Sequence, residues 1–153
     1  MKIKPLKNLT MPDLPSEGIR VCIKDLEMIE KDDRYEVTME EWHMPYESDG
    51  KCDVCLGGAR LARYYNDPKL IASDRHFMKP KIQAMNYFRM FEWNCGITVY
   101  LHTDVAAGNF SSQKLAKCLI ELGNIKICTY REDTDRFKKR MLLAADIMEE
   151  YGF

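Results

Sequence analysis

The strongest constraint on the fold is the helical spacing of apolar residues near the end of the chain. Between Asp133 and Tyr151 the apolar positions recur every three or four residues, while lysines and arginines occupy the other faces. Such spacing is typical of a helix that buries one side. The apolar positions are Phe137, Met141, Ala144, Ala145, Met148 and Tyr151. A chain that ends this way is expected to pack helix against helix.

The same spacing predicts other helices. One covers about 19–31, and another begins at Ser111 or Ser112 and stops at Gly123. A third is expected from Cys52 to about Tyr65, with two successive glycines that favour close backbone packing. A short fourth helix is expected to begin at Thr38, to carry Trp42 and to stop at Pro45, because Thr38-x-x-Glu41 has the spacing of a capping box.

The segment from Pro80 to about Cys95 is apolar on nearly every side of a helical wheel. A helix without a polar face is most simply the buried centre of a domain. After it, alternating apolar residues at 97–101 indicate a short strand, as they do at 125–129 and at Tyr35 with Val37.

These elements predict a mainly α fold, with α+β as the open alternative. We expect a compact bundle of about five or six helices around the buried central helix, with at most two or three short strands. Prolines in 1–17 indicate an extended N-terminal arm, and 18–153 is expected to form a single globular domain.

Size and composition narrow the class of protein. A chain of 153 residues that is 46% hydrophobic and 31% charged can bury a core without a disulfide or metal. The first residues lack the apolar core of a signal peptide, and no apolar stretch approaches the roughly 18 residues of a membrane span. A cytoplasmic location is expected, so the six cysteines are interpreted as reduced thiols.

Charge is distributed unevenly, although the net charge is only −1. From 25 to 53 there are eleven acidic residues against three basic ones, whereas 60–89 is basic. An electronegative surface would suit a protein partner that is itself basic or binds nucleic acid. The candidate partner-binding residues are Asp32, Asp33, Glu36, Glu40, Glu41, Glu47 and Asp49.

Cys52-x-x-Cys55 is the motif that most suggests chemistry, because two cysteines at this spacing can share a zinc ion. His43, Cys22 or Cys95 would have to complete the ligands, with His43 the first choice. A redox pair would need a βαβ context that the sequence lacks. The favoured interpretation is that both cysteines pack in the interior, so no metal or other cofactor is expected and zinc is kept as the alternative.

The run from Tyr35 to Ala62 resembles a pattern in uncharacterised small bacteriophage and bacterial proteins. In these, an aromatic-x-Met-x-x-Trp stretch precedes Cys-x-x-Cys-Leu/Ile-x-Gly-x-Ala. The matching positions are Tyr35, Trp42, Cys52, Cys55, Leu56, Gly58 and Ala59. The loop between Trp42 and Cys52 departs from the commoner short version. The resemblance implies a phage-type accessory protein and carries no activity.

The sequence is therefore compatible with three functions. The first is a non-enzymatic accessory protein that binds a host or defence macromolecule in the host cytoplasm and inhibits or modulates it, partly through the acidic segment. The second is a zinc-stabilised nucleic-acid-binding protein that uses Cys52, Cys55 and the basic stretch 60–89. The third is a cysteine-dependent enzyme built on Cys55 with His43 or His102. A homo-oligomer is compatible with all three.

Overall fold

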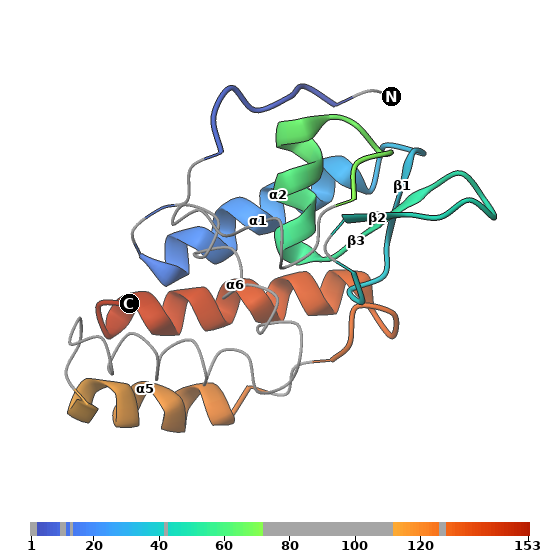
Figure 1. Ribbon diagram of the computed structural model, residues 1–153. Helices are drawn as coiled ribbons and strands as arrows, with labels where there is room; N and C mark the ends of the chain where they lie inside the picture. Colours follow the sequence, from blue (N-terminus) through green and yellow to red (C-terminus); the bar gives the residue numbers. More distant parts are fainter. Residues whose placement is uncertain (1–2, 10–11, 13, 42, 72–111, 126–127) are drawn as a thin grey trace.

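The computed structural model describes residues 3–9, 12, 14–41, 43–71, 112–125 and 128–153. Within these ranges the chain is α+β, with four helices and a three-stranded mixed sheet. Helices α1 (Pro15–Ile29) and α6 (Thr134–Glu150) lie side by side, α2 (Leu56–Tyr65) packs on α1, and α5 (Ser112–Gly123) packs on α6 (Figure 1). None of the helices in these ranges is long and apolar enough to cross a membrane.

The expected bundle of five or six helices is not what the described residues form. The helix expected at 80–95 and the strand expected at 97–101 lie outside them, and so do two residues of the strand expected at 125–129. The central helix therefore stays a prediction.

The helix predicted between Asp133 and Tyr151, where the apolar spacing is clearest, is confirmed as α6. The Asp133 side chain caps its first turn by accepting a hydrogen bond from the Arg136 N–H at 2.9 Å. Its buried residues are Phe137, Met141, Ala144, Ala145 and Met148, as the spacing predicts, whereas Tyr151 follows the helix and is only partly buried. The chain end is fixed as well, because Phe153 is buried and its carbonyl accepts a hydrogen bond from Ser16 Oγ at 2.6 Å.

Helix α1 begins at Pro15, four residues before the expected start at 19. Proline suits the first turn of a helix, where its missing N–H has no partner to lose. The N-terminal segment before it contacts the body of the protein. Ile3 is buried, and the Leu6 N–H donates to the Arg63 carbonyl at 2.9 Å.

The sheet consists of β1 (Tyr35–Val37), β2 (His43–Pro45) and β3 (Cys52–Val54), in the order β1-β3-β2. β1 runs parallel to β3, and β2 runs antiparallel to it. The extended piece predicted at Tyr35 and Val37 is confirmed as β1.

Two expected helices need correction. The helix expected from Thr38 to Pro45 is wrong. The N–H groups of Thr38 and Met39 both donate to the Val54 carbonyl, Met39 has a φ of 62°, and His43–Pro45 form β2. The helix expected from Cys52 begins only at Leu56, since Cys52–Val54 form the central strand.

Candidate functional site

The side chains of the strands lie on two opposite faces of the sheet, because successive side chains in a strand point in opposite directions. Tyr35, His43, Cys52 and Val54 are buried on the face toward the helices. On the other face, the strand register places Glu36 directly beside Asp53, and Asp53 beside Met44. Two acidic residues are therefore neighbours in the middle of the outward face.

Further carboxylates surround this pair. Burial raises the pKa of the Asp53 carboxyl above its ordinary value, and the negative charges of Glu36, Asp49, Glu40 and Glu41 raise it further. The pKa of Tyr46 is raised by desolvation and by carboxylates of the same group. We call Glu36, Glu40, Glu41, Asp49 and Asp53 the acidic sheet face.

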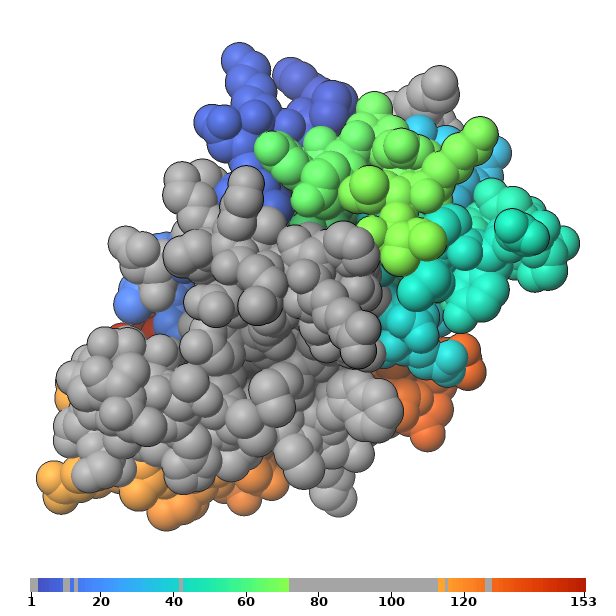
Figure 2. Space-filling model, in the orientation of Figure 1, coloured from blue at the N-terminus to red at the C-terminus, as the bar shows by residue number. Residues whose placement is uncertain are grey.

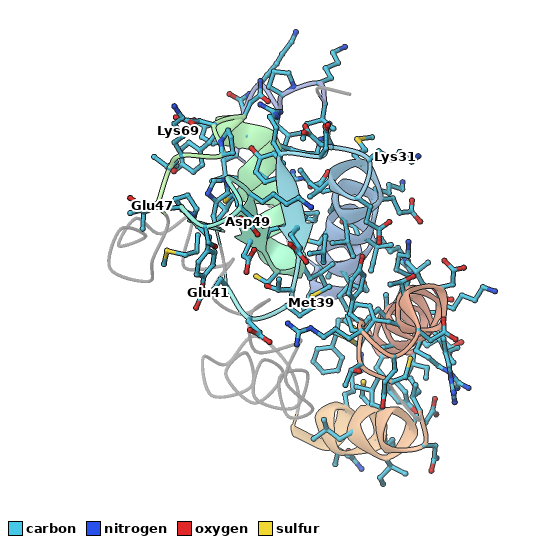
Figure 3. The ribbon with its side chains drawn as sticks, turned by 90° about the vertical axis from the view of Figure 1, so that its right-hand side faces the viewer. Lys31, Met39, Glu41, Glu47, Asp49 and Lys69 are labelled. Carbon is cyan, nitrogen blue, oxygen red and sulfur yellow. The ribbon has the colours of Figure 1, made fainter. Side chains whose placement is uncertain are left out.

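The β2–β3 hairpin and the loop after β1 hold these residues in place. The turn of the hairpin includes Gly50, whose φ of 72° suits glycine, and the Asp49 carboxylate accepts a hydrogen bond from the Lys51 N–H at 3.0 Å. The hairpin protrudes at the right-hand edge of the space-filling view (Figure 2). Glu41, Glu47 and Asp49 come from these loops and lie on the sheet side of the molecule (Figure 3).

The seven candidate partner-binding residues differ in their exposure to solvent. Glu36, Glu40, Glu47 and Asp49 are exposed, Glu41 is partly exposed, and Asp33 is exposed next to the buried Asp32. Glu40 forms a surface ion pair with Arg131 at 2.8 Å.

Asp32 has a different environment. Its side chain is 1% exposed and forms an ion pair with Arg34 at 2.7 Å. The hydrogen bond from Arg34 lowers the pKa of the Asp32 carboxyl. Asp32 therefore stabilises the start of the sheet and is not presented to a partner.

Asp25 is a buried charge, which the count of acids in the segment 25–53 does not distinguish from the others. Its side chain is 1% exposed and accepts hydrogen bonds from Arg60 at 2.8 Å and from Arg63. These bonds join α1 to α2. Arg60 and Arg63, the first two basic residues of the stretch 60–89, are thus bound to Asp25.

The residues proposed as zinc ligands do not converge on one point. Cys52 Sγ lies 3.3 Å from His43 Nδ1, but this nitrogen also lies 2.6 Å from the Leu70 carbonyl, to which it donates. Cys55 Sγ instead accepts a hydrogen bond from the Gly58 N–H at 3.3 Å and caps α2. Across the described ranges, no three His, Cys, Asp or Glu side chains are grouped as metal ligands.

Cys52 and His43 on this inner face are buried in their neutral forms. Burial raises the pKa of the Cys52 thiol to about 12, so the free thiol is protonated near pH 7, whereas nucleophilic attack needs the thiolate. Burial lowers the pKa of His43, so its ring is neutral near pH 7. Both side chains are fully buried. His102 and Trp42 lie outside the described residues.

Tyr35 completes the inner face. Its ring meets that of His43 edge to face, with the centroids 5.7 Å apart. Burial raises the pKa of its phenol to about 12. Tyr35 Oη and His43 Nε2 are buried without a hydrogen-bond partner, as far as the described residues show. The inner face therefore holds neutral groups packed in the core, and the charged groups are on the outer face.

Comparison of the chain with family models, with curated proteins and with solved structures finds no match in any of the three.

Proposed function

We propose that this protein acts by binding a basic protein partner through the acidic sheet face, without catalysing a reaction. The partner is a host or defence macromolecule whose activity the protein inhibits or modulates. The assignment to a phage-type accessory protein depends on the resemblance over Tyr35 to Ala62 alone.

The observation that carries the proposal is the position of Glu36 and Asp53. These two carboxylates are directly opposed in neighbouring strands. Like charges in this arrangement destabilise a sheet. Glu40, Glu41 and Asp49 add to the same field. The pKa of Asp53 is raised first by burial and then by the charges of these neighbours. A cationic partner would relieve this repulsion on binding.

The same field disfavours nucleic acid as the direct partner of this face, because phosphates would be repelled. It suits the Lys- or Arg-rich surface with which a nucleic-acid-binding protein contacts its own ligand. Binding of this kind should weaken as salt concentration rises.

The test is affinity purification from the native host with matched charge variants. One variant carries Glu36→Lys, Glu40→Lys and Glu41→Lys. The control carries Glu17→Lys, Glu27→Lys and Glu150→Lys, which change three exposed acids on α1 and α6 by the same amount. We expect the first variant to lose the partner that the wild-type protein and the control both retain. Equal recovery by both variants would refute the electrostatic proposal.

A further inference from the structure

Among the described residues, β1 forms an edge of the sheet beside the acidic sheet face. The strand order is β1-β3-β2, so, within the part of the chain that the structure describes, β1 has a neighbour on one side only. An unpaired strand edge presents backbone N–H and C=O groups to which another extended chain can bond.

The register identifies which groups these are. The Arg34 carbonyl accepts from the Cys52 N–H at 3.0 Å, and the Thr38 N–H donates to the Val54 carbonyl at 3.1 Å. Together with the parallel pairing of Tyr35 with Cys52 and of Val37 with Val54, these bonds use Arg34, Glu36 and Thr38 on the β3 side. The N–H and C=O of Val37 consequently point away from β3, toward the free edge.

A groove runs along this edge. It has a volume of about 480 Å³ and lies between β1 on one side and the start of α6 on the other, with Val37, Thr134 and Asp135 among its lining residues. This volume falls within the ~300–1,000 Å³ that is usual for ligand sites. The free edge is therefore accompanied by space for the side chains of an added strand.

The groove adjoins the acidic sheet face and is itself lined by more carboxylates than lysines. Three carboxylates and two lysines line it. One of the lysines, Lys138, is already bound to Glu30 at 2.9 Å, and Tyr130 Oη donates to the same carboxylate at 2.6 Å. Glu36 belongs to both the groove and the acidic sheet face, so it lies where an added strand would meet the negative charge.

We propose that an extended, basic segment of the partner adds to β1 as a fourth strand and lies in this groove. The inference rests on the proposed function and specifies how the partner is bound. Residues of the segment that lie beside Glu36 would point to the acidic sheet face and should be Lys or Arg. Those beside Tyr35 and Val37 would point into the groove and should be small or apolar. Backbone bonds to Val37 would then supply affinity, and the alternating charges would supply specificity.

A second copy of this chain is the competing occupant of the edge. Pairing β1 with β1 of another copy would bring two acidic sheet faces together, which like-charge repulsion opposes. A concentration-dependent dimer of the wild-type protein that Val37→Pro abolishes would show that the edge serves self-association, and would overturn the proposal.

The experiment uses the full chain labelled with ¹⁵N and a defined probe, a seven-residue peptide that alternates Lys and Val with Lys at both ends. The comparison peptide has the same residues and charge but is N-methylated at its valines, so that it cannot complete a strand ladder. We expect the first peptide to slow hydrogen exchange at the Val37 amide and the second to bind at least roughly fivefold more weakly.

Two protein variants separate the backbone from the side chain. Val37→Pro removes the edge N–H and leaves the bonds to β3 intact, because proline is tolerated in edge strands. Val37→Ala keeps the N–H and removes most of the side chain. We expect Val37→Pro to weaken the peptide roughly fivefold or more and Val37→Ala to bind nearly as the wild type does.

The outcomes separate this inference from the proposed function. Equal affinity of the two peptides, or an unchanged Val37 amide at saturation, would overturn strand addition even if Val37→Pro failed to fold. If the Glu36, Glu40 and Glu41 variant loses the native partner while Val37→Pro retains it, the acidic sheet face binds the partner but the edge does not. If neither variant loses the partner, the proposed function itself fails.

Discussion

Replacing Asp25 with alanine tests the buried ion cluster that joins α1 to α2. The carboxylate is 1% exposed, and the Arg60 and Arg63 side chains that donate to it are 8% and 14% exposed. Alanine would leave two nearly buried guanidinium groups without this counter-charge. The loss should therefore exceed that of an ordinary hydrogen bond, because the remaining charges stay desolvated.

The expected cost is about 3–5 kcal/mol, the range for removing one partner of a buried ion pair. A domain of this size has about 5–15 kcal/mol of total stability, so the variant should lose a large fraction of it. At about 2–4 °C per kcal/mol, Tm should fall by roughly 6–20 °C. Asp25→Asn keeps an acceptor for the arginines and should cost less than Asp25→Ala.

The assay is urea unfolding followed by circular dichroism, with Asp146→Ala as the matched control. Asp146 also accepts from an arginine, since Arg20 lies 2.7 Å away, but its side chain is 64% exposed. An exposed pair is worth at most about 1 kcal/mol, so the control should unfold almost as the wild type does. A cost below about 1 kcal/mol for Asp25→Ala, with an unchanged dependence on urea, would refute the view that these charges are desolvated.

Three further predictions follow from the site. Burial lowers the pKa of His43 below its ordinary 6.5, so as the pH falls the unfolded chain becomes protonated at His43 before the folded protein does. The free energy of unfolding should therefore fall below about pH 6.5, by up to about 1.4 kcal/mol per pH unit. His43→Leu should remove that dependence in urea unfolding at pH 7.5 and 5.5, and an equal slope in both proteins would contradict it. Glu36→Gln should lower the pKa of Asp53 in an NMR titration of its side-chain carbon, because one of the charges that raise it is removed; an unchanged titration would mean that Glu36 does not act on Asp53. Cys55→Ala should cost about 1 kcal/mol through loss of the cap on the Gly58 N–H, while Cys55→Ser, which keeps an acceptor, should cost less, and equal losses would show that the cap is unimportant.

The helices could be predicted from the sequence because their signal is local. In α6, the residues that alternate between core and solvent are three or four positions apart, and the spacing identifies Phe137 and Met141 as buried before any partner is known. The end of α5 at Gly123 follows from the same kind of signal.

The sheet was harder to predict because each strand has only three residues and depends on partners elsewhere in the chain. Cys52–Val54 lies almost directly before α2, so the sequence pattern predicts these residues to be the first turn of that helix. Likewise, Thr38-x-x-Glu41 has the spacing of a capping box, but the bonds from Thr38 and Met39 to Val54 hold this segment against β3. A capping motif does not start a helix where its N–H groups already donate hydrogen bonds to a neighbouring strand.

The acidic site was only partly predictable for the same reason. Counting charges along the chain finds the segment but treats Asp25, Asp32 and Asp53 alike, although two are buried in ion pairs and the third lies in the sheet. A local signal existed for Asp25, since it falls three residues after Cys22 and four before Ile29 on the apolar side of α1. No local signal could place Asp53 beside Glu36, because only the strand register does so.

This register is the feature by which the proposed binding surface differs from an ordinary solvated one. Acidic residues that are merely exposed repel one another weakly and can turn apart in water. Glu36 and Asp53 are fixed side by side by the backbone of β1 and β3, and the partial burial of Asp53 strengthens the repulsion. Folding alone would favour threonine or an opposite charge at one of these positions, because either would stabilise the strand pair. An arrangement that costs stability, at the edge of a small sheet and beside an open groove, is what the proposed binding of a cationic chain would explain.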